Sequence, residues 1–166
     1  LRPLAYERVK EELTETPYIR YCDVVLVLYA VMAHEGNDYF TTRIRRSQMV
    51  GWKRKEEELL EEALANTSLL YPPRLYAVED LFAWDKKRPG DGKFMNETQE
   101  VRMNSSMRGY VLTNTLEING AVALFYPGVA RRLAVIFGGD FYIAFTSVHE
   151  AQIHSVGLLT PAVIEE

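Results

Sequence analysis

The chain has 166 residues, of which 48% are hydrophobic and 25% charged, proportions typical of a soluble globular protein with a sizeable core. The formal net charge of −4 argues against nonspecific nucleic-acid binding as the main role. A single cysteine, Cys22, excludes an intramolecular disulfide and a cysteine zinc cluster, and no apolar run reaches the roughly 18 to 20 residues of a membrane helix. We therefore expect one domain over residues 1–166, with no nucleic-acid or membrane partner and with Cys22 as a small buried hydrophobe.

The first element is expected to be a short amphipathic helix. Tyr6, Val9 and Leu13 recur at helical spacing, which predicts a helix over Ala5–Thr14. Pro17 then ends it.

The next stretch predicts a β-hairpin over Tyr21–Arg43. Tyr21–Met32 is dense in β-branched and aromatic residues, and His34–Asp38 forms a polar, glycine-containing turn before a second strand-favouring run. A buried helix over Asp23–Met32 is the alternative, because short apolar runs are ambiguous between the two structures.

Helical signals follow the hairpin. Ser47 is expected to cap a short turn through Met49–Trp52. Lys55–Asn66 has the apolar spacing of an amphipathic helix, with Leu59, Leu60, Ala63 and Leu64 on its inner face. The acidic run at its N-terminus, 56–58, is interpreted as a solvated face favoured by the helix dipole rather than as a binding site. Val78–Trp84 predicts another short helix.

Asp85–Arg108 is expected to be a flexible excursion (85–108) from the domain. It contains glycines, prolines and serines with few apolar anchors, and its cations outnumber its anions. Trp84 and Phe94 beside these cations make a nucleic-acid arm an alternative, but a solvated loop is the favoured interpretation.

The C-terminal third predicts a strand–helix–strand–strand unit, preceded by a strand over Gly109–Thr113. Ala121–Tyr126 is apolar throughout, as in a strand covered on both faces. A helix is expected between Pro127 and the Gly138-Gly139 pair, and period-two alternation resumes at Asp140 and leads through a tight turn into a third strand.

Together these elements predict an α+β fold with an antiparallel or mixed sheet of about five strands and helices packed against it. Leu133 and Phe141 are expected in the core. Tyr110, Tyr126 and Tyr142 are expected to pack by their rings while their hydroxyls reach the surface.

Several fragments together resemble one known family. They are Tyr6…Lys10…Leu13…Pro17…Asp23, Glu57-Leu59-Leu60…Ala65-Asn66-Thr67, Tyr110–Asn114, Gly120-Ala121 with Tyr126-Pro127-Gly128, and Asp140-Phe141-Tyr142 with Ser147–Glu150. They resemble the domain-of-unknown-function family five-six-eight-eight, over most of the chain except Asp85–Arg108. The hairpin, the acidic helix and the strand–helix–strand ending are also similar to a second uncharacterised family, which carries an Arg-Asp pair where this chain has His149-Glu150.

The resemblance implies a cytoplasmic bacterial protein, but it supplies no activity, cofactor or catalytic residue. The chain departs from the first family at Phe145-Thr146, where its members often carry a proline and a serine.

The candidate site is the polar cluster Ser147, His149 and Glu150, with His154 nearby. A zinc-protease motif needs histidines four residues apart, whereas His149 and His154 are five apart and face different ways on a helix or a strand. No metal or other cofactor is therefore expected.

The serine and histidine could form a nucleophile and base, although no nucleophile elbow surrounds Ser147. We favour a structural interpretation, in which Ser147 caps a helical turn and Glu150 completes a capping box.

Two functional hypotheses follow. The first is a noncatalytic binding or interaction module with a protein partner. The second is an unassigned hydrolase that uses the Ser147–His149–Glu150 turn. A deep pocket converging on His149 would favour the enzyme, and a shallow surface with an exposed apolar patch would favour the module.

Overall fold

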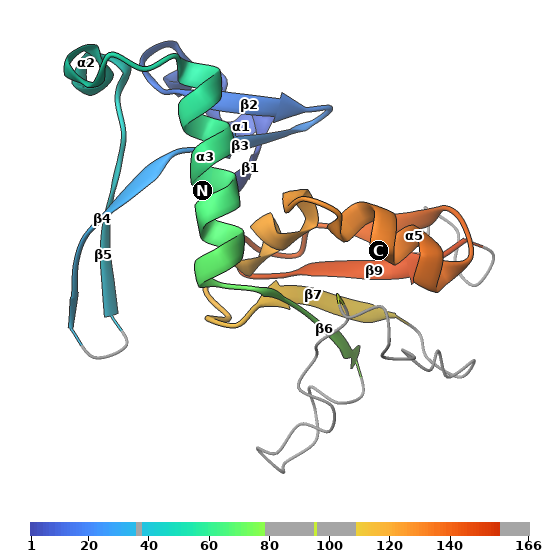
Figure 1. Ribbon diagram of the computed structural model, residues 1–166. Helices are drawn as coiled ribbons and strands as arrows, with labels where there is room; N and C mark the ends of the chain where they lie inside the picture. Colours follow the sequence, from blue (N-terminus) through green and yellow to red (C-terminus); the bar gives the residue numbers. More distant parts are fainter. Residues whose placement is uncertain (36–37, 79–94, 96–108, 157–166) are drawn as a thin grey trace. The chain divides into compact units, whose positions relative to one another are not determined.

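The structure, a computed structural model, describes residues 1–35, 38–78, 95 and 109–156 (Figure 1). It combines helices with antiparallel sheets, so the α+β class is confirmed. The chain divides into two compact units, Leu1–Thr67 and Ser68–Glu166. The described strands form sheets of three, two and four strands rather than one sheet of about five. Each described strand pairs only with strands of its own unit, so the expected single sheet is wrong.

The three-stranded sheet of the first unit comprises β1 (Arg2–Ala5), β2 (Tyr18–Tyr21) and β3 (Val24–Val27), in the order β1-β3-β2. Central β3 pairs on both edges, and its residues 25–27 are fully buried. The Cys22-Asp23 turn joins β2 to β3, and Cys22 has a φ of 50° and is exposed. Cys22 is therefore a turn residue, and its expected burial is wrong.

Two short helices stand where one was expected over Ala5–Thr14. They are α1 (Tyr6–Val9) and the 3-10 helix η1 (Glu12–Glu15). The backbone N–H of Tyr6 donates to the carbonyl of Asp23, and residues before it pair in β1, so the helix begins late. Leu13 is buried, as its place in the helical pattern implied.

The predicted hairpin is present as a two-stranded ribbon of β4 (Tyr29–Glu35) and β5 (Asp38–Arg43), which leads away from the three-stranded sheet (Figure 1). The helical alternative over Asp23–Met32 is wrong, because the chain leaves β3 and enters β4 as extended backbone. The N–H of Ile44 donates to the carbonyl of Leu28 at 3.0 Å, so the ladder continues into the buried base of the ribbon.

Helices α2 (Arg46–Met49), η2 (Val50–Trp52, a 3-10 helix) and α3 (Glu56–Leu70) follow. The predicted helix over Lys55–Asn66 is confirmed as α3, which continues to Leu70. Ser47 does not cap α2. The N-cap residue is Arg45, whose backbone N–H donates to Gln48 Oε1 at 2.7 Å.

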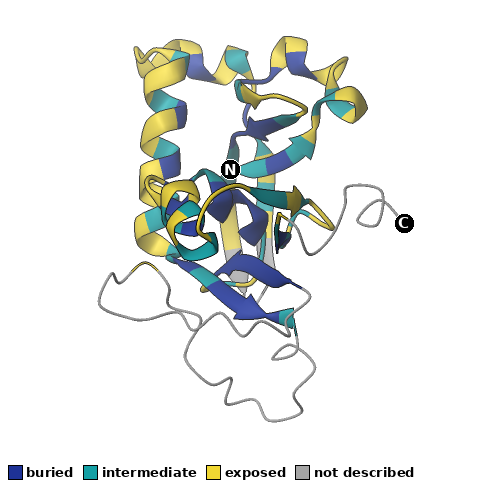
Figure 2. Cartoon of the chain, turned by 90° about the vertical axis from the view of Figure 1, so that its right-hand side faces the viewer, coloured by how far each residue is buried: buried dark blue, intermediate teal, exposed yellow. Residues whose placement is uncertain are grey.

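Helix α3 carries exposed residues along one side and buried residues along the other (Figure 2). Its Leu60 joins Leu28, Ile44 and Met49 in a buried cluster of the first unit, with Leu59 and Ala63 packed against it. The residues expected on the inner face of this helix therefore lie there.

The second unit contains a four-stranded antiparallel sheet. Its strands are β6 (Pro73–Ala77), β7 (Tyr110–Asn114), β8 (Phe141–Ala144) and β9 (Ala151–Ser155), in the order β6-β7-β9-β8. The strand expected at Gly109–Thr113 is confirmed as β7. The sequence did not predict strand β6, because its proline start hides the strand signal.

The apolar run Ala121–Tyr126 is not a strand but the core of a 3-10 helix, η3 (Gly120–Phe125). Residues 121–124 are all buried, which explains why every position is apolar. A continuous apolar run does not separate a buried strand from a buried helix by periodicity. The predicted strand–helix–strand–strand order is present only if β7, rather than Ala121–Tyr126, is counted as its first strand.

The helix expected after Pro127 is confirmed as α5 (Val129–Phe137), and Gly138 ends it with a φ of 72°. Leu133 is 0% exposed and is confirmed as a core residue. Phe141 is only half-buried, because β8 is an edge strand, so its assignment to the core is wrong.

The hydroxyls of Tyr110 and Tyr126 are buried, so the expectation that they reach the surface is wrong. Burial raises the pKa of Tyr126 to about 12.

Two predicted segments, the helix over Val78–Trp84 and the excursion Asp85–Arg108, lie outside the described residues apart from Val78 and Met95. In the described part of the chain, no helix combines the length and the apolar character that crossing a membrane requires.

Candidate functional site

The predicted site, Ser147–Glu150, is the turn between β8 and β9. Ser147 Oγ accepts the backbone N–H of His149 at 3.0 Å, so the serine folds the turn onto itself. Strand β9 begins at Ala151, directly after Glu150, and leaves no helix for a capping box. Ser147 therefore has a structural role, but it stabilises a turn instead of capping a helix. The predicted capping box is wrong.

His149 ties this turn to the loop before η3. Its Nδ1 accepts the backbone N–H of Asn119 at 3.1 Å, and its carbonyl accepts the Thr113 hydroxyl at 2.8 Å. The carbonyl of Val148 also accepts the N–H of Ala121 at 3.3 Å. These contacts cross more than twenty-five residues of sequence, so the turn is part of the packing of the second unit.

Gly120 lies in the tightest part of this arrangement. A Cβ at this position would lie 2.0 Å from Thr113 Oγ1 and 2.6 Å from the His149 carbonyl oxygen. The close approach of the turn to β7 therefore requires glycine at position 120.

These contacts limit the chemistry of the imidazole. Because Nδ1 accepts a hydrogen bond, the proton of the neutral ring lies on Nε2. The Nε2–H group can donate a hydrogen bond, but it cannot act as a base. The described hydrogen bonds of Ser147 and of the His149 ring join each to a backbone amide. The turn thus brings Ser147 and His149 together without the hydroxyl-to-imidazole contact that a nucleophile and base need.

His154 lies away from this turn, on β9 opposite Tyr142. It is buried beside Gly109, whereas His149 is exposed. Throughout residues 1–35, 38–78, 95 and 109–156, His, Cys, Asp and Glu side chains form no group of three or more that could hold a metal ion.

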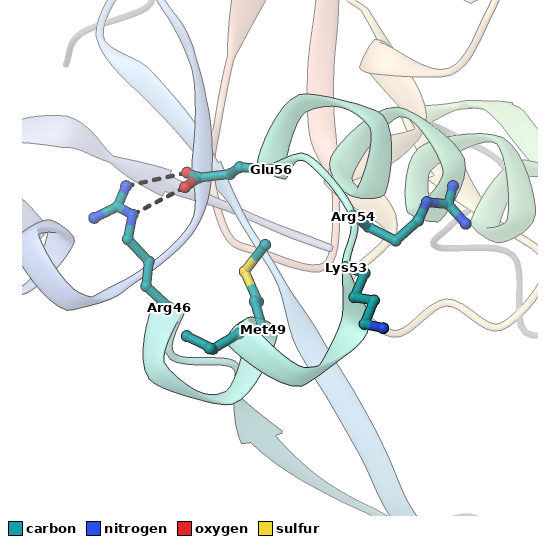
Figure 3. Close-up of a pocket in the computed structure, with 6 residues that line it drawn as sticks. Arg46, Met49, Lys53, Arg54 and Glu56 are labelled. Atoms are coloured by element: carbon teal, nitrogen blue, oxygen red, sulfur yellow. Dashed lines mark hydrogen bonds and ion pairs between the residues drawn. The ribbon is translucent and has the colours of Figure 1, made fainter.

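A pocket of about 300 Å³ lies in the first unit beside α2, η2 and the start of α3 (Figure 3). It is lined by Arg46, Met49, Val50, Lys53, Arg54 and Glu56. Sequence reasoning did not identify it, because its walls meet only after the chain turns at η2.

A bidentate ion pair forms one wall of this pocket. Arg46 Nε and Nη2 donate to Glu56 at 2.9 and 3.0 Å. Arg46 Nη1 also donates to the carbonyls of Leu13 and Thr14, and the N–H of Tyr18 donates to Glu56 Oε1 at 3.2 Å. The hydrogen bonds from Arg46 lower the pKa of Glu56, and those to Glu56 raise the pKa of Arg46. The pair therefore braces α3 against η1 and β2.

A second pocket, of about 520 Å³, has a mixed charge. It is lined by Glu11, Glu12, Glu15, Thr16, Thr42, Arg43 and Arg45. Arg43 pairs with Glu12, and Thr16 donates its hydroxyl to the carbonyl of Glu12. Both pockets are thus bordered by residues already engaged in stabilising the first unit.

The β4–β5 ribbon exposes three large apolar side chains. Val31 and Phe40 are each 58% exposed, and Met32 is 68% exposed. At the base, by contrast, Leu28 and Ile44 are buried. The sequence predicted the strands of this hairpin, but apolar residues in a strand ordinarily indicate a covered face, so the exposure of these three side chains was missed.

Comparison with protein families identifies the family of this chain. The family model described as a family of unknown function (DUF5688) covers residues 3–156, and the chain belongs to this family. No curated protein and no solved structure matches the chain.

Proposed function

We propose that this member of the DUF5688 family is a noncatalytic interaction module that binds a protein partner through the β4–β5 ribbon. The supporting observation is the exposure of Val31, Met32 and Phe40 on a ribbon whose base is buried. A cytoplasmic bacterial setting, which the sequence resemblance implies, is part of the same proposal.

Physical chemistry supports a covered state of the ribbon. A two-stranded hairpin is marginally stable in water by itself, and exposed apolar side chains gain free energy when a partner removes them from water. Aromatic residues and methionine are enriched in protein interfaces. The anchored base holds the ribbon in place, so its apolar residues are presented without a large ordering penalty on binding.

Site-specific photocrosslinking tests the proposal. Benzoylphenylalanine replaces Met32 in the ribbon or, as a matched control, Val135 on α5, which is 64% exposed. We expect a discrete protein adduct from position 32 that is absent from position 135 and disappears when Phe40→Thr is added. Identical adducts from both positions, or an adduct unaffected by Phe40→Thr, would overturn the proposal.

A further inference from the structure

The geometry points to the free edge of β5 as the acceptor of an extended strand from the partner, so that the ribbon becomes a three-stranded sheet. This inference rests on the proposed interaction function and specifies how the partner binds. Among the residues that the structure describes, β5 pairs with β4 alone. Within this part of the chain, one edge of β5 is therefore open for main-chain hydrogen bonds.

The register shows which amides of β5 point to that open edge. Ile44 donates its N–H to Leu28 of the facing strand, and Tyr29 is opposite Arg43. Because amide direction alternates along a strand, the N–H groups of Thr42 and Phe40 point toward β4. Those of Arg43 and Thr41 point away from it and face the open edge.

The outer edge of β4 is a poorer acceptor. Its register shifts between Val31 and Ala33, so Met32 is the extra residue of a β-bulge. A bulge twists a strand and interrupts its hydrogen-bonding pattern, which protects an edge against pairing. Strand β5 has no such irregularity, and its positions 39–42 are Tyr, Phe, Thr and Thr, with no charge to repel a neighbouring strand.

The side chains of β5 indicate the chemistry of the added strand. Phe40 is opposite Ala33, so these two residues share one face, while Thr41 and Val31 share the other. A strand added to β5 places a residue beside Phe40 and its neighbour beside Thr41. The partner segment is therefore extended and uncharged. It has an aromatic or β-branched residue beside Phe40, and the neighbouring residue of the segment can pack beside Thr41.

The test uses a proline that removes one outward amide. A random 12-residue peptide library displayed on phage is selected on the wild-type protein, and an enriched peptide is then made synthetically. Thr41→Pro deletes the N–H at the open edge but no hydrogen bond of the ribbon. Thr41→Val is the matched control, since it keeps the amide and also removes the Thr41 hydroxyl that accepts from Arg2.

We expect Thr41→Pro to weaken peptide binding about tenfold or more, because a buried carbonyl of the peptide loses its partner, whereas Thr41→Val changes affinity little. Slower amide hydrogen exchange at Thr41 and Arg43 of the wild-type protein on adding the peptide is the second expected result. This measurement decides the matter if Thr41→Pro fails to fold.

The failures are distinguishable. Peptide binding that is lost in Phe40→Thr but unchanged in Thr41→Pro would overturn strand addition while the interaction function stands. Binding insensitive to Phe40→Thr would overturn both. Dimerisation of the wild-type protein in sedimentation, abolished by Thr41→Pro, would identify a second copy as the occupant and overturn the assignment to a different partner.

Discussion

The Arg46–Glu56 brace makes a quantitative prediction about stability. Glu56 accepts two hydrogen bonds from Arg46 and one from the backbone N–H of Tyr18, and its side chain is 27% exposed. A partly exposed ion pair contributes about 1 kcal/mol, and the hydrogen bond to Tyr18 contributes about 1 kcal/mol. We therefore expect Glu56→Ala to lower the free energy of unfolding by about 2 kcal/mol and Glu56→Gln, which keeps an acceptor for Tyr18, by about 1 kcal/mol.

Urea unfolding followed by circular dichroism measures these changes. Glu57, exposed in the same first turn of α3, provides the matched control, because Glu57→Gln alters the helix-dipole interaction without touching the brace. We expect this control to cost only a few tenths of a kcal/mol. Equal losses in Glu56→Gln and Glu57→Gln would refute the brace.

The pH dependence gives an independent check. Hydrogen bonds from Arg46 lower the pKa of Glu56 below its ordinary value of 4.5. A lowered pKa in the folded state means that the stabilisation is fully present above the unfolded-state pKa and is lost as the pH falls through the folded-state value. Wild-type stability should therefore fall more steeply below pH 4.5 than that of Glu56→Gln. Parallel acid profiles would contradict this assignment.

Three further substitutions test the fold, each by urea unfolding. Gly120→Ala should lower the free energy of unfolding by about 3 kcal/mol, because its Cβ would meet the Thr113 hydroxyl and a backbone carbonyl. Gly51→Ala, with no atom within 4 Å of the new Cβ, should lower it by less than about 1 kcal/mol. Similar values for the two variants would contradict the close packing at position 120. Cys22→Gly should stabilise the chain by about 0.5 kcal/mol, since an exposed residue with a φ of 50° gains from glycine, and a loss of stability would refute this. Leu133→Ala should cost about 2–5 kcal/mol and exposed Arg131→Ala little, and equal effects would mean that the face of α5 is misassigned.

Local signals in the sequence were sufficient to predict a helix where the spacing of apolar residues agreed with the residues at the helix ends. The apolar positions 59, 60, 63 and 64 gave α3 its buried side, and Pro127 with Gly138 bounded α5. These signals suffice because helix faces and helix ends depend on residues within one or two turns. The same reasoning located the Ser147–Glu150 turn between two strands.

Other features depended on residues far apart in the sequence. The run Ala121–Leu124 is buried as a 3-10 helix rather than a strand, a choice that its uniform apolar pattern does not encode. His149 acquired its structural role from Asn119 and Thr113, which reach it only through the packing of the second unit.

The β4–β5 ribbon shows most clearly which features follow from local sequence signals and which follow from tertiary packing. Strand propensity predicted extended backbone at Val31 and Phe40, but whether another element covers their side chains is decided by the tertiary structure. A strand pattern specifies which residues share a face, not what lies against that face. Strand propensity is therefore enough to predict the ribbon, whereas the exposure of its apolar residues depends on which elements pack around it in three dimensions.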